Sequence, residues 1–536
     1  MKITFLGAAR QVTGSRTLLE WLPGRFCLID CGMEQGEQTL EMEEMPIPAG
    51  QIEYVFLTHA HIDHSGLLPL LVKQGFGGRI YATTETTNLC AIMLADSAQI
   101  QESDAAWTSK KNQRVGLPPV EPLYTAEDAA KAMTLFRPCP YQQEIPVDEG
   151  LTVRFQDAGH LLGSSFIEFF LQEGDQKRTM VFSGDVGNTC QPIIRDPDPA
   201  SEADYLMIES TYGDRLHEKT ADPIPRLVEI LTRTFRRGGS VIIPSFAVGR
   251  TQEILYFLRE IYQQRLLPPD VADIPVYVDS PLANEATAVF LQCGTECLDE
   301  EALSVMRGGE NPIWFEGLQT LTSAEESMRL NTDASRKVVI ASGGMCEGGR
   351  IRHHLKHNLW DKKNTILFVG YQAAGTLGRL IYDGAKTVKI LGEPIECNAE
   401  ICLLEGISGH ADRDGLLAWM KTFRRMPSRV FVNHGDDEVA VSFARTIEDT
   451  FHVPALAPAS GSSFDLVSGE WIRLTDPVYR KPKAAKERKE TRKAEDTYAR
   501  LMDAVNGLVH YARGLEGHAN SELRALTEKI YELTHS

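Results

Sequence analysis

Short apolar runs, rich in β-branched and aromatic residues, recur along the first part of the chain, and polar residues follow each of them. The runs are KITFLG (2–7), RFCLIDCG (25–32), YVFLT (54–58), GRIYAT (78–83), LTVRFQDAG (151–159), SFIEFFLQ (165–172), TMVFSGDVG (179–187) and YLMIES (205–210). Runs of this length, bounded by turn residues, predict short strands that alternate with loops and helices. The pattern indicates an α/β protein in which polar side chains collect at strand ends.

From residue 212 to about residue 390 the alternation becomes more regular. The strand-like runs there are SVIIPS (240–245), PVYVDS (275–280), KVVIAS (337–342), NTILFVG (364–370) and TVKILG (387–392). The segment 249–264, GRTQEILYFLREIYQQ, reads as a helix between two of them. This repetition predicts βαβ units and a parallel sheet that forms a second domain.

In the segments 400–420 and 429–451, apolar runs are again followed by polar residues, as in the first part of the chain. The last segment begins with RKPKAAKERKETRK (480–493), in which eight Lys or Arg stand against two Glu. Its composition has high helix propensity and predicts a helical extension with a basic start.

The overall composition is that of an ordinary soluble globular protein, with 536 residues of which 43% are hydrophobic and 24% charged. The N-terminal residues are too polar for a secretory signal, and no apolar run approaches the ~18 to 20 residues of a membrane helix. We therefore expect a soluble, cytoplasmic protein without a membrane partner. The ten cysteines include no CxxC pair, which indicates reduced thiols rather than disulfides or a zinc knuckle.

The net charge of −19 argues weakly against binding nucleic acid through the overall field. The charge is unevenly distributed, however, as the basic run at 480–493 shows. A local basic groove that binds nucleic acid therefore stays compatible with the acidic total.

The stretch LTHAHIDHSGLLP (57–69) places three imidazoles and a carboxylate directly after a predicted buried strand. Titratable groups at the edge of a core need partners, because burying them unpaired is costly. Residues two apart on an extended chain point to the same side, roughly 6 to 7 Å apart. His59 and His61 can therefore hold one ion, while Asp63 and His64 face a second.

Four further predicted strands end in residues of the same type: Asp30, His160, Asp185 and His434. We group the predicted ligands as His59, His61 and His160 for one metal, Asp63, His64 and His434 for the other, with Asp185 bridging. Imidazole and carboxylate ligands without thiolate suit zinc or manganese at a catalytic site. The alternative is that each residue only satisfies local hydrogen bonds, which would be the better interpretation of an isolated His160 or His434.

HAHIDH, together with Asp30, His160 and Asp185, resembles the metallo-β-lactamase superfamily. Further stretches resemble its β-CASP nuclease branch, and in pattern the bacterial and archaeal homologues of the nuclease subunit of the pre-mRNA 3′-end cleavage factor. They are ESTYGD (209–214), VIIPSFAVGRTQEIL (241–255), YVDSPLA (277–283), ASGGMCEGGR (341–350), GYQAAGTLGR (370–379), SGHAD (408–412) and VNHGD (432–436). The likeness covers roughly residues 1 to 466.

The resemblance implies an α/β fold class, an αββα metallo-β-lactamase sandwich with an inserted parallel-sheet β-CASP domain and a helical C-terminal extension. The predicted boundaries are 1–208 and 392–475 for the two parts of the sandwich, 209–391 for the insertion and 476–536 for the extension.

The resemblance also implies that Glu209, His410 and His434 are the three β-CASP motif residues. His434 would complete the second metal's ligands, His410 would sit over the scissile phosphate, and Glu209 would hold its imidazole. A His whose pKa is raised by a carboxylate can protonate a leaving alkoxide near neutral pH. Asp63 is placed among the catalytic residues as well as the ligands. Asp30 is expected to support the ligands from behind rather than to bind metal.

The predicted function is that of a zinc-dependent ribonuclease with two zinc ions, or manganese in their place. A hydroxide bridging the metals, formed because metal lowers the pKa of water to about 7, attacks phosphorus and leaves 5′-phosphate and 3′-hydroxyl ends. The resemblance selects single-stranded RNA, since DNA-repair members of the branch usually lack His at the position of His434. Internal cutting and 5′-exonuclease action both remain open.

Substrate contacts are expected at the glycine-rich stretches and at the motif loop. The predicted residues are Ser342, Gly343, Gly344, Ser408, Arg250, Arg350 and Arg379. Backbone N–H groups of glycine-rich loops can bind phosphates. The alternative is that these glycines only shape turns between strands and helices. The basic cluster GGRIRHHLKH (348–357) could track an RNA backbone, or form one solvated helix face.

Other functions stay open at this point. A small-molecule hydrolase of thioesterase or lactamase type would use the same metal ligands but would not explain the long insertion. A non-catalytic subunit of an RNA-processing complex would not need all seven ligands, and a deoxyribonuclease would need a different substrate test. A homodimer is implied by the resemblance alone, and the tail could bind RNA, mediate dimerisation or form a helical arm.

Overall fold

The computed structural model describes residues 1–36, 39–114, 116–217, 222–373 and 375–480, together with Arg524, Thr527, Glu528 and Tyr531. Met1–Val478 form one unit and Tyr479–Ser536 another. The predicted helical extension lies almost wholly outside the described residues, and so does nearly all of the basic run 480–493. The four described residues near the C-terminus are helical.

An eight-stranded mixed sheet contains the strand that precedes the histidine-rich stretch. Its order is β23-β22-β1-β2-β3-β4-β5-β6. The strands are β1 (Lys2–Gly7), β2 (Arg16–Leu22), β3 (Arg25–Ile29), β4 (Ile52–Phe56), β5 (Arg79–Thr83), β6 (Phe136–Cys139), β22 (Ser463–Asp465) and β23 (Glu470–Arg473). Parallel pairing of β3, β4, β5 and β6 brings their carboxyl ends to one edge.

A seven-stranded sheet packs against the first and carries the remaining polar-ended strands. Its order is β21-β20-β11-β10-β9-β8-β7. The strands are β7 (Glu144–Asp148), β8 (Leu151–Asp157), β9 (Ser165–Glu173), β10 (Gln176–Phe182), β11 (Tyr205–Ile208), β20 (Arg429–Val432) and β21 (Ala455–Leu456). The parallel strands β10, β11 and β20 end side by side.

The two sheets share an aromatic core. Phe56 of the first sheet meets Phe169 of the second edge-on, with ring centroids 5.0 Å apart, and both side chains are fully buried. Such burial is worth about 1.5 to 3 kcal/mol for each large apolar side chain. Alternating buried and partly exposed residues along β8 fit a strand with one face in this core.

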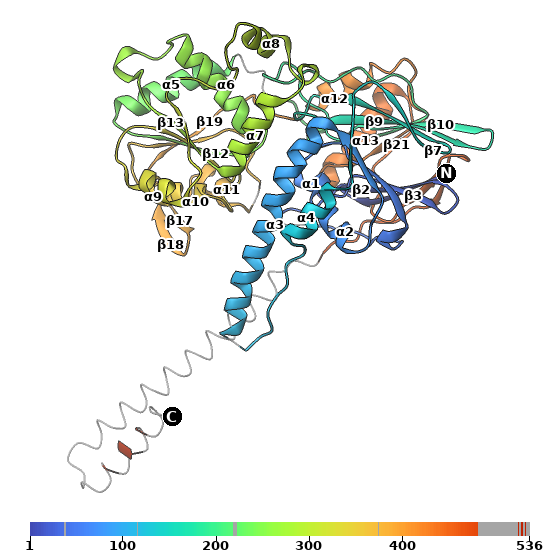
Figure 1. Cartoon of the computed structure of the whole chain (residues 1–536), viewed down its shortest axis with the longest axis horizontal. Helices are drawn as coiled ribbons and strands as arrows, with labels where there is room; N and C mark the ends of the chain where they lie inside the picture. The colour runs from blue at the N-terminus through green and yellow to red at the C-terminus, as the bar shows by residue number, and fades with distance from the viewer. Residues whose placement is uncertain are drawn as a thin grey trace. The chain divides into compact units, whose positions relative to one another are not determined.

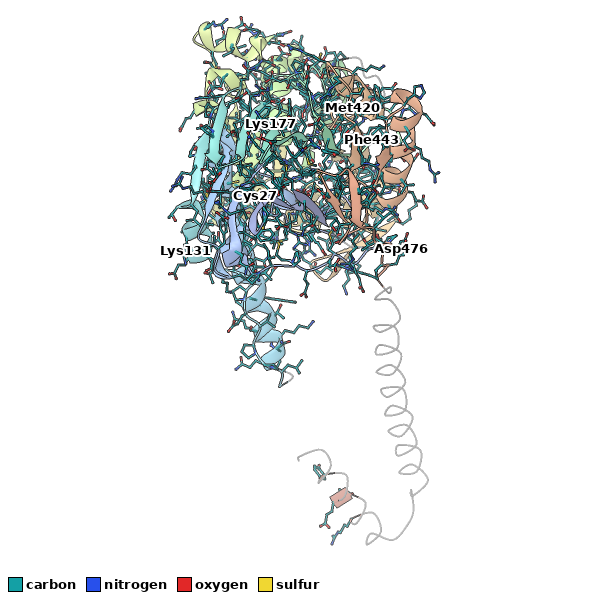
Figure 2. The ribbon with its side chains drawn as sticks, turned by 90° about the vertical axis from the view of Figure 1, so that its right-hand side faces the viewer. Cys27, Lys131, Lys177, Met420, Phe443 and Asp476 are labelled. Atoms are coloured by element: carbon teal, nitrogen blue, oxygen red, sulfur yellow. The ribbon has the colours of Figure 1, made fainter. Side chains whose placement is uncertain are left out.

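Helices cover the outer faces of both sheets (Figure 1). The helices of this part are α1 (Ile62–Ser65), α2 (Leu68–Lys73), α3 (Thr84–Gln113), α4 (Ala126–Met133), α12 (Arg413–Met420), α13 (Asp437–Phe451) and the short 3₁₀ turn Ala49–Gln51. Leu71 and Leu89 on α2 and α3 pack against the first sheet. Met420 and Phe443, labelled in Figure 2, are fully buried against the second sheet. The layers are therefore helix, sheet, sheet, helix.

A six-stranded parallel sheet forms the inserted part, in the order β14-β13-β15-β12-β16-β19. The strands are β12 (Val241–Ser245), β13 (Val276–Asp279), β14 (Leu318–Thr320), β15 (Val338–Ser342), β16 (Thr365–Phe368) and β19 (Glu400–Leu403). The continuous apolar runs of β12 and β16 are buried throughout, as expected for parallel strands covered on both faces.

Two groups of helices cover the faces of this sheet (Figure 1). They are α5 (Pro223–Arg236), α6 (Arg250–Gln263), α7 (Pro281–Gln292), α8 (Glu300–Arg307), α9 (Ala324–Thr332), α10 (Ile351–Asn358), α11 (Leu377–Tyr382) and the 3₁₀ turns Pro269–Val271 and Thr295–Cys297. Ile230 and Ile254 pack on one face, whereas Leu355 and Ile381 pack on the other. The predicted fold class, an αββα sandwich with an inserted parallel-sheet part, is confirmed.

Some local features differ from the sequence-based expectation. Strand β2 was not predicted, although RTLLEWL alternates buried and partly exposed residues over its second half. The run 387–392 was expected to join the parallel sheet but forms an antiparallel hairpin, β17 (Thr387–Ile390) with β18 (Glu393–Glu396). Leu391 and Gly392 between them both have positive φ, which suits a two-residue hairpin turn.

Strand β19 pairs with β16, so the parallel sheet continues through Leu403, past the predicted boundary at residue 391. The other domain boundaries stay predictions. Among the described helices, none is both long and apolar enough to cross a membrane.

Candidate metal centre and active site

The histidine-rich stretch leaves the carboxyl end of β4 and turns into the short helix α1. His59 and His64 are fully buried, and His61 and Asp63 are partly buried. Gly32 lies against this turn, where a Cβ atom would come within 1.6 Å of the Asp63 carbonyl oxygen. The turn is therefore packed tightly from behind, which holds its side chains toward the strand ends of the second sheet.

Three imidazole nitrogens meet at a first cluster. Nδ1 of His61 lies 3.1 Å from Nε2 of His59 and 3.2 Å from Nε2 of His160. Oδ2 of Asp185 completes the group, at 3.5 Å from Nε2 of His59 and 3.6 Å from Nε2 of His160. All four ligand atoms lie within 4.8 Å of one another. The structure thus brings together the residues predicted for the first metal.

A second cluster consists of His64, His434 and Asp63. The Nε2 atoms of His64 and His434 are 3.1 Å apart, and Nε2 of His434 lies 3.5 Å from Oδ2 of Asp63. These residues come from α1 and from the end of β20, at opposite ends of the sequence. They are the residues that the sequence assigned to the second metal.

Asp185, at the end of β10, offers one oxygen to each cluster. Its Oδ2 faces the first cluster, whereas its Oδ1 lies 3.3 Å from Nε2 of His64 and 3.5 Å from Nδ1 of His434. Oδ1 is buried without a hydrogen-bond partner among the described residues. A buried carboxylate oxygen without a partner is costly, so this arrangement calls for a cation beside it.

Groups behind the ligands fix the direction in which the histidines point. His64 donates from Nδ1 to Oδ2 of Asp30 at 2.7 Å, and His160 donates from Nδ1 to the Gly409 carbonyl at 2.8 Å. Both contacts turn Nε2 toward its cluster, which is how outer partners orient metal-binding histidines. Asp30 itself is held by the Thr58 backbone N–H at 2.8 Å. Asp30 therefore lies behind a ligand, in contact with His64.

The donor set fits divalent metal ions. Ligand nitrogens at about 2.0 Å from one tetrahedral ion lie roughly 3.3 Å apart, close to the separations within both clusters. A cation between the facing ring nitrogens would also partner the buried Oδ1 of Asp185. The oxygen and nitrogen donors suit zinc or manganese. The arrangement of these residues therefore supports metal binding.

Burial and charge shift the pKa values of these groups in opposite directions. Burial lowers the pKa of His59 and of His160 well below the usual range of histidine, which keeps both available as neutral ligands. Burial raises the pKa of Asp63, but the hydrogen bond and charge of His434 outweigh it and lower the pKa to about 2. His59, His160 and Asp63 are thus held in the protonation states that metal binding requires. Burial also lowers the pKa of His64, but the charges of Asp185 and Asp30 outweigh it and raise that pKa, so a metal ion there must displace a proton.

His410 and Glu209 form a pair beside the first cluster. Nδ1 of His410 lies 3.1 and 3.2 Å from the two carboxylate oxygens of Glu209, which is almost fully buried. Nε2 of His410 lies 3.9 Å from Oδ2 of Asp185. Burial lowers the pKa of His410, but the charges of Glu209 and Asp185 outweigh it and raise the pKa to about 9. These charges favour the protonated form of His410, and its Nε2 faces the centre.

The loops that carry these motifs are joined by contacts that the sequence did not reveal. His217 donates from Nε2 to the His410 carbonyl at 2.9 Å, and its ring lies 4.7 Å from that of Tyr212. Thr211, whose hydroxyl lies 3.2 Å from Nδ1 of His434, was also missed. Its signal was its place in ESTYGD, two residues after Glu209. The Gly409 carbonyl has no such signal, because it is a backbone group.

The predicted substrate-binding residues lie in other surroundings. Arg350 donates to Oδ1 of the fully buried Asp279 at 2.6 Å. Arg379 donates to Asp383 at 2.9 Å, and Arg250 pairs with Glu253. Each of the three guanidinium groups therefore already has a carboxylate partner.

The glycine-rich loop after β15 supports the alternative of turn shaping at one position. Gly343 has a φ of +117° and donates its N–H to the Ser245 carbonyl at 3.0 Å, so that N–H is already used. Ser342 ends β15 and Gly344 follows Gly343. Ser408 accepts a hydrogen bond from the His410 N–H at 3.3 Å, next to the site. Substrate binding by these residues stays a prediction.

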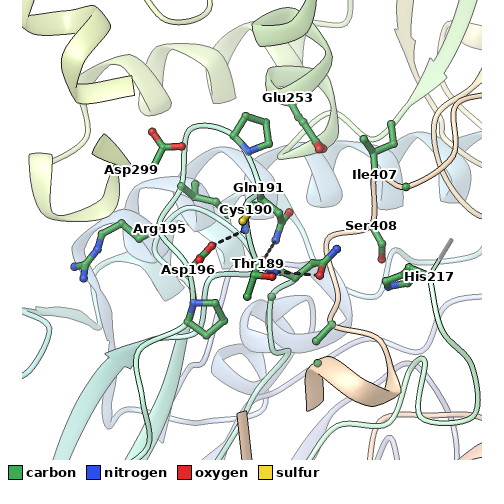
Figure 3. Close-up of a pocket in the computed structure, with 18 of the residues that line it drawn as sticks. Thr189, Cys190, Gln191, Arg195, Asp196, His217, Glu253, Asp299, Ile407 and Ser408 are labelled. Carbon is green, nitrogen blue, oxygen red and sulfur yellow. Dashed lines mark hydrogen bonds between the residues drawn. The ribbon is translucent and has the colours of Figure 1, made fainter. Parts of the chain in front are cut away.

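A cavity of about 1610 Å³ lies between the sandwich and the helices of the inserted part (Figure 3). Gln191, His217 and Ser408 lie on one side of it, and Glu253 and Asp299 on the other. His217 and Ser408 both hydrogen-bond to the backbone of His410. Its lining includes many carboxylates: Asp196, Asp198, Asp222, Glu253, Glu260, Asp299, Glu300, Glu301, Asp412 and Asp414. Such a lining repels phosphate, so a nucleic-acid backbone is expected to approach from elsewhere.

Three family models match the chain. The metallo-β-lactamase superfamily model matches residues 17–209, the β-CASP domain model residues 251–381, and the model of a Zn-dependent metallo-hydrolase RNA specificity domain residues 394–458. The matched segments contain all the residues of both metal clusters and the His410–Glu209 pair.

Proteins from a bacterium and two archaea are similar over most of their length. A ribonuclease of Thermus thermophilus is 37% identical over 83% of this chain and 96% of its own length. A transcription termination factor, FttA, of Methanosarcina mazei is 32% identical over 83% of this chain and 69% of its own. An RNase J-like protein of Methanocaldococcus jannaschii is 31% identical over 86% and 98%.

These matches confirm the resemblance that the sequence motifs indicated, and with it the assignment of the chain as a metal-dependent hydrolase. Neither the metal's identity nor the number of ions follows from them. The chain belongs to the β-CASP branch of the metallo-β-lactamase superfamily.

Proposed function

We propose that the protein is a ribonuclease that binds two zinc ions and hydrolyses phosphodiester bonds of single-stranded RNA, leaving 5′-phosphate and 3′-hydroxyl ends. The observation that carries this proposal is the His410–Glu209 pair, whose imidazole stands 3.9 Å from the carboxylate shared by both clusters. A small-molecule hydrolase of the same superfamily needs the metal ligands. It does not need the additional imidazole of His410, which is not among those ligands.

The substrate class rests on the relatives. The relative from Thermus thermophilus is named a ribonuclease, and one of the matching models is named an RNA specificity domain. That model covers the loop with His410 and the strand end with His434. The segment that aims the imidazole at the centre is thus the segment that the model associates with RNA.

The ligand residues would hold one ion between His59, His61, His160 and Asp185, and the second between Asp63, His64, His434 and Asp185. When bound, two such ions supply an activated water molecule and neutralise charge on the phosphate. Manganese would suit the same oxygen and nitrogen donors.

The protein's own contribution to the reaction is proton delivery and orientation. As the bond between phosphorus and the 3′-oxygen breaks, Nε2 of His410 gives its proton to that oxygen, which leaves as the 3′-hydroxyl. The phosphate stays with the 5′-oxygen of the next nucleotide. Glu209 holds the imidazole by Nδ1 and stabilises its charged form, and general acid catalysis of this kind contributes about 10²- to 10⁴-fold.

The test uses protein loaded with zinc and a 5′-labelled single-stranded RNA, with a DNA of the same sequence alongside. We expect RNA cleavage that a chelator abolishes, labelled fragments that end in a 3′-hydroxyl, and loss of cleavage in His410→Ala with the metal content unchanged. Fragment lengths distinguish internal cutting from stepwise removal at the 5′ end. Wild-type protein that carries two metals but leaves RNA intact, while it hydrolyses a chromogenic ester or lactam, would overturn the proposal.

A further inference from the structure

Two large aromatic side chains stand exposed at the carboxyl edge of the parallel sheet. Phe246 directly follows β12 and is 51% exposed, and Tyr371 follows β16 and is 53% exposed. β12 and β16 are neighbours in the sheet, so both rings belong to the same edge. In open α/β sheets this is the edge where ligands bind.

The backbone under both rings is held in place although the rings themselves are exposed. The Phe246 carbonyl accepts hydrogen bonds from the hydroxyls of Thr251, at 2.6 Å, and Ser245, at 3.1 Å. Gln372, next to Tyr371 and almost fully buried, donates from Nε2 to the Gly344 carbonyl at 3.0 Å. Exposed rings on a fixed backbone lose little freedom when they bind a ligand.

The glycine-rich loop lies between the two residues. A Cβ atom at Gly344 would come within 3.1 Å of the Phe246 ring, so the ring packs directly over the bare backbone. Through Gln372 the same glycine is tied to the segment of Tyr371. Phe246 and Tyr371 therefore flank one loop, and glycine keeps the surface between them free of side chains.

A chain of rings and charges connects this edge to the active site. The Tyr212 ring lies 6.1 Å from that of His410 and carries the guanidinium of Arg215 over it at 5.7 Å. Asp214 raises the pKa of Arg215, and the neighbouring phenol of Tyr371 adds to this effect. Tyr212 and Arg215 thus lie beside His410, and the phenol of Tyr371 acts on the charge of Arg215.

Charge alone is a weak means of holding RNA on this surface. The chain has a net charge of −19, and Arg215, Arg250 and Arg379 each pair with a carboxylate. Stacking of bases on aromatic rings needs no net charge and tolerates any sequence. The rings of Phe246 and Tyr371 could therefore hold a single strand of RNA although the protein is acidic and its arginines are paired.

We propose that Phe246 and Tyr371 are base-stacking residues that hold unpaired nucleotides of single-stranded RNA beside the scissile phosphate. The inference rests on the proposed function and adds a substrate requirement: the nucleotides next to the cut must be unpaired, because paired bases are already stacked in a duplex. Both are positioning residues, since neither touches the reacting atoms.

The first test measures binding of a labelled single-stranded RNA to the full chain in the presence of a chelator, so that the RNA stays intact. We expect Phe246→Ala and Tyr371→Ala to weaken binding by about five- to hundredfold each, the range for lost base–aromatic stacking. Tyr371→Phe keeps the ring and should restore binding. The matched control is Trp360→Ala, because Trp360 is 55% exposed but precedes β16 and so belongs to the opposite edge.

The second test uses RNAs with one abasic nucleotide at successive positions around the cut. An abasic position that weakens wild-type binding should cause no further loss in the matching alanine variant, because the stacking partner is already absent. In cleavage by zinc-loaded protein the alanine variants should raise KM with little change in kcat.

The outcomes separate this inference from the proposed function. RNA that binds as expected but is never cut would refute the nuclease while supporting the stacking residues. RNA that is cut, with binding and KM of both alanine variants at the wild-type level, would overturn the stacking role alone. A change in oligomeric state measured by light scattering, with RNA binding unaffected, would identify the rings as a protein interface and would also overturn it.

Discussion

The Nδ1 atom of His410 lies 3.1 Å from Oε1 of Glu209, although the two residues are 201 positions apart in the chain. The Glu209 carboxylate also accepts the backbone N–H groups of Val186, at 2.7 Å, and Thr211, at 3.2 Å. It is therefore fixed by the backbone on one side and fixes the imidazole on the other.

Replacing this carboxylate by an amide should weaken the acid that His410 provides. We expect Glu209→Gln to lower RNA cleavage by about 10²-fold or more, since proton transfer contributes about 10²- to 10⁴-fold. The pKa of His410 should fall, so the loss of activity at alkaline pH should begin at a lower pH than in the wild type. A pH–rate profile, with bound metal measured in parallel, checks this. Glu202→Gln, an exposed carboxylate, is the control.

Asp30→Asn tests the group behind His64. The amide no longer stabilises the proton on Nδ1 of His64 as an anion does, so metal affinity should fall about 10- to 100-fold. Asparagine tolerates the φ of +59° at this position, which limits strain in the backbone. Competition with a chelator of known affinity measures the loss. An unchanged metal affinity would mean that the carboxylate of Asp30 is not needed to orient His64, and that its role is to accept hydrogen bonds such as that from the Thr58 backbone N–H.

Arg350→Ala distinguishes a structural role of this arginine from RNA binding. Its guanidinium pairs with the fully buried Asp279, which also accepts from Nε2 of His354 at 2.6 Å. Because Asp279 keeps its contact with His354, losing this one charged hydrogen bond should cost about 1.5 to 3 kcal/mol, and the variant should unfold at lower denaturant.

Arg379→Ala is the matched comparison, because the side chain of Arg379 is 38% exposed and its pair with Asp383 lies at the surface. The free energy of unfolding should change by less than about 1 kcal/mol. If the two variants instead lost RNA affinity equally and neither lost stability, both arginines would act on RNA, as the sequence suggested.

Asp157 makes stability depend on pH. Burial raises the pKa of its carboxyl group to about 7, against a contribution from the Gly159 N–H that lowers it. Below pH 4 the group is protonated in both the folded and the unfolded chain. As the pH rises to 7 only the unfolded chain ionises, so stability falls, by an amount on the order of 4 kcal/mol at alkaline pH.

Asp157→Asn should remove this dependence, because an amide carries no charge and still accepts from the Gly159 N–H. Denaturant midpoints of wild type and variant should lie close together at pH 4 and separate at pH 8, with the variant more stable. The exposed Asp449→Asn should follow the wild type at both pH values. An equal gap at pH 4 and pH 8 would show that the Asp157 carboxyl is not the titrating group.

The metal clusters could be predicted from the sequence because their signal is local. His59, His61, Asp63 and His64 follow one buried strand, and the other candidate ligands follow strands whose ends meet at the same edge. The alternation of apolar and polar runs was likewise enough for the layers of both parts. The residues that follow a strand, and so stand at its end, can be identified from one short segment of sequence.

Pairings between distant segments could not be read in this way. β19 is four residues long, and its place beside β16 depends on the whole sheet rather than on its own letters. The partner of Arg350 lies 71 residues before it, so the sequence showed a cation but not the carboxylate that occupies it. Nor does the sequence show that the rings of Phe246 and Tyr371 are exposed.

His64 and His434 face each other across 370 positions of the chain. During synthesis the first cluster's histidines leave the ribosome early, but the second cluster and His410 are absent until nearly the whole sandwich and the inserted sheet have been made. A nascent or truncated chain that ends before residue 410 therefore has neither a complete second cluster nor a proton donor. In a chain built in this order, the residues of both metal clusters come together only when the fold is almost finished.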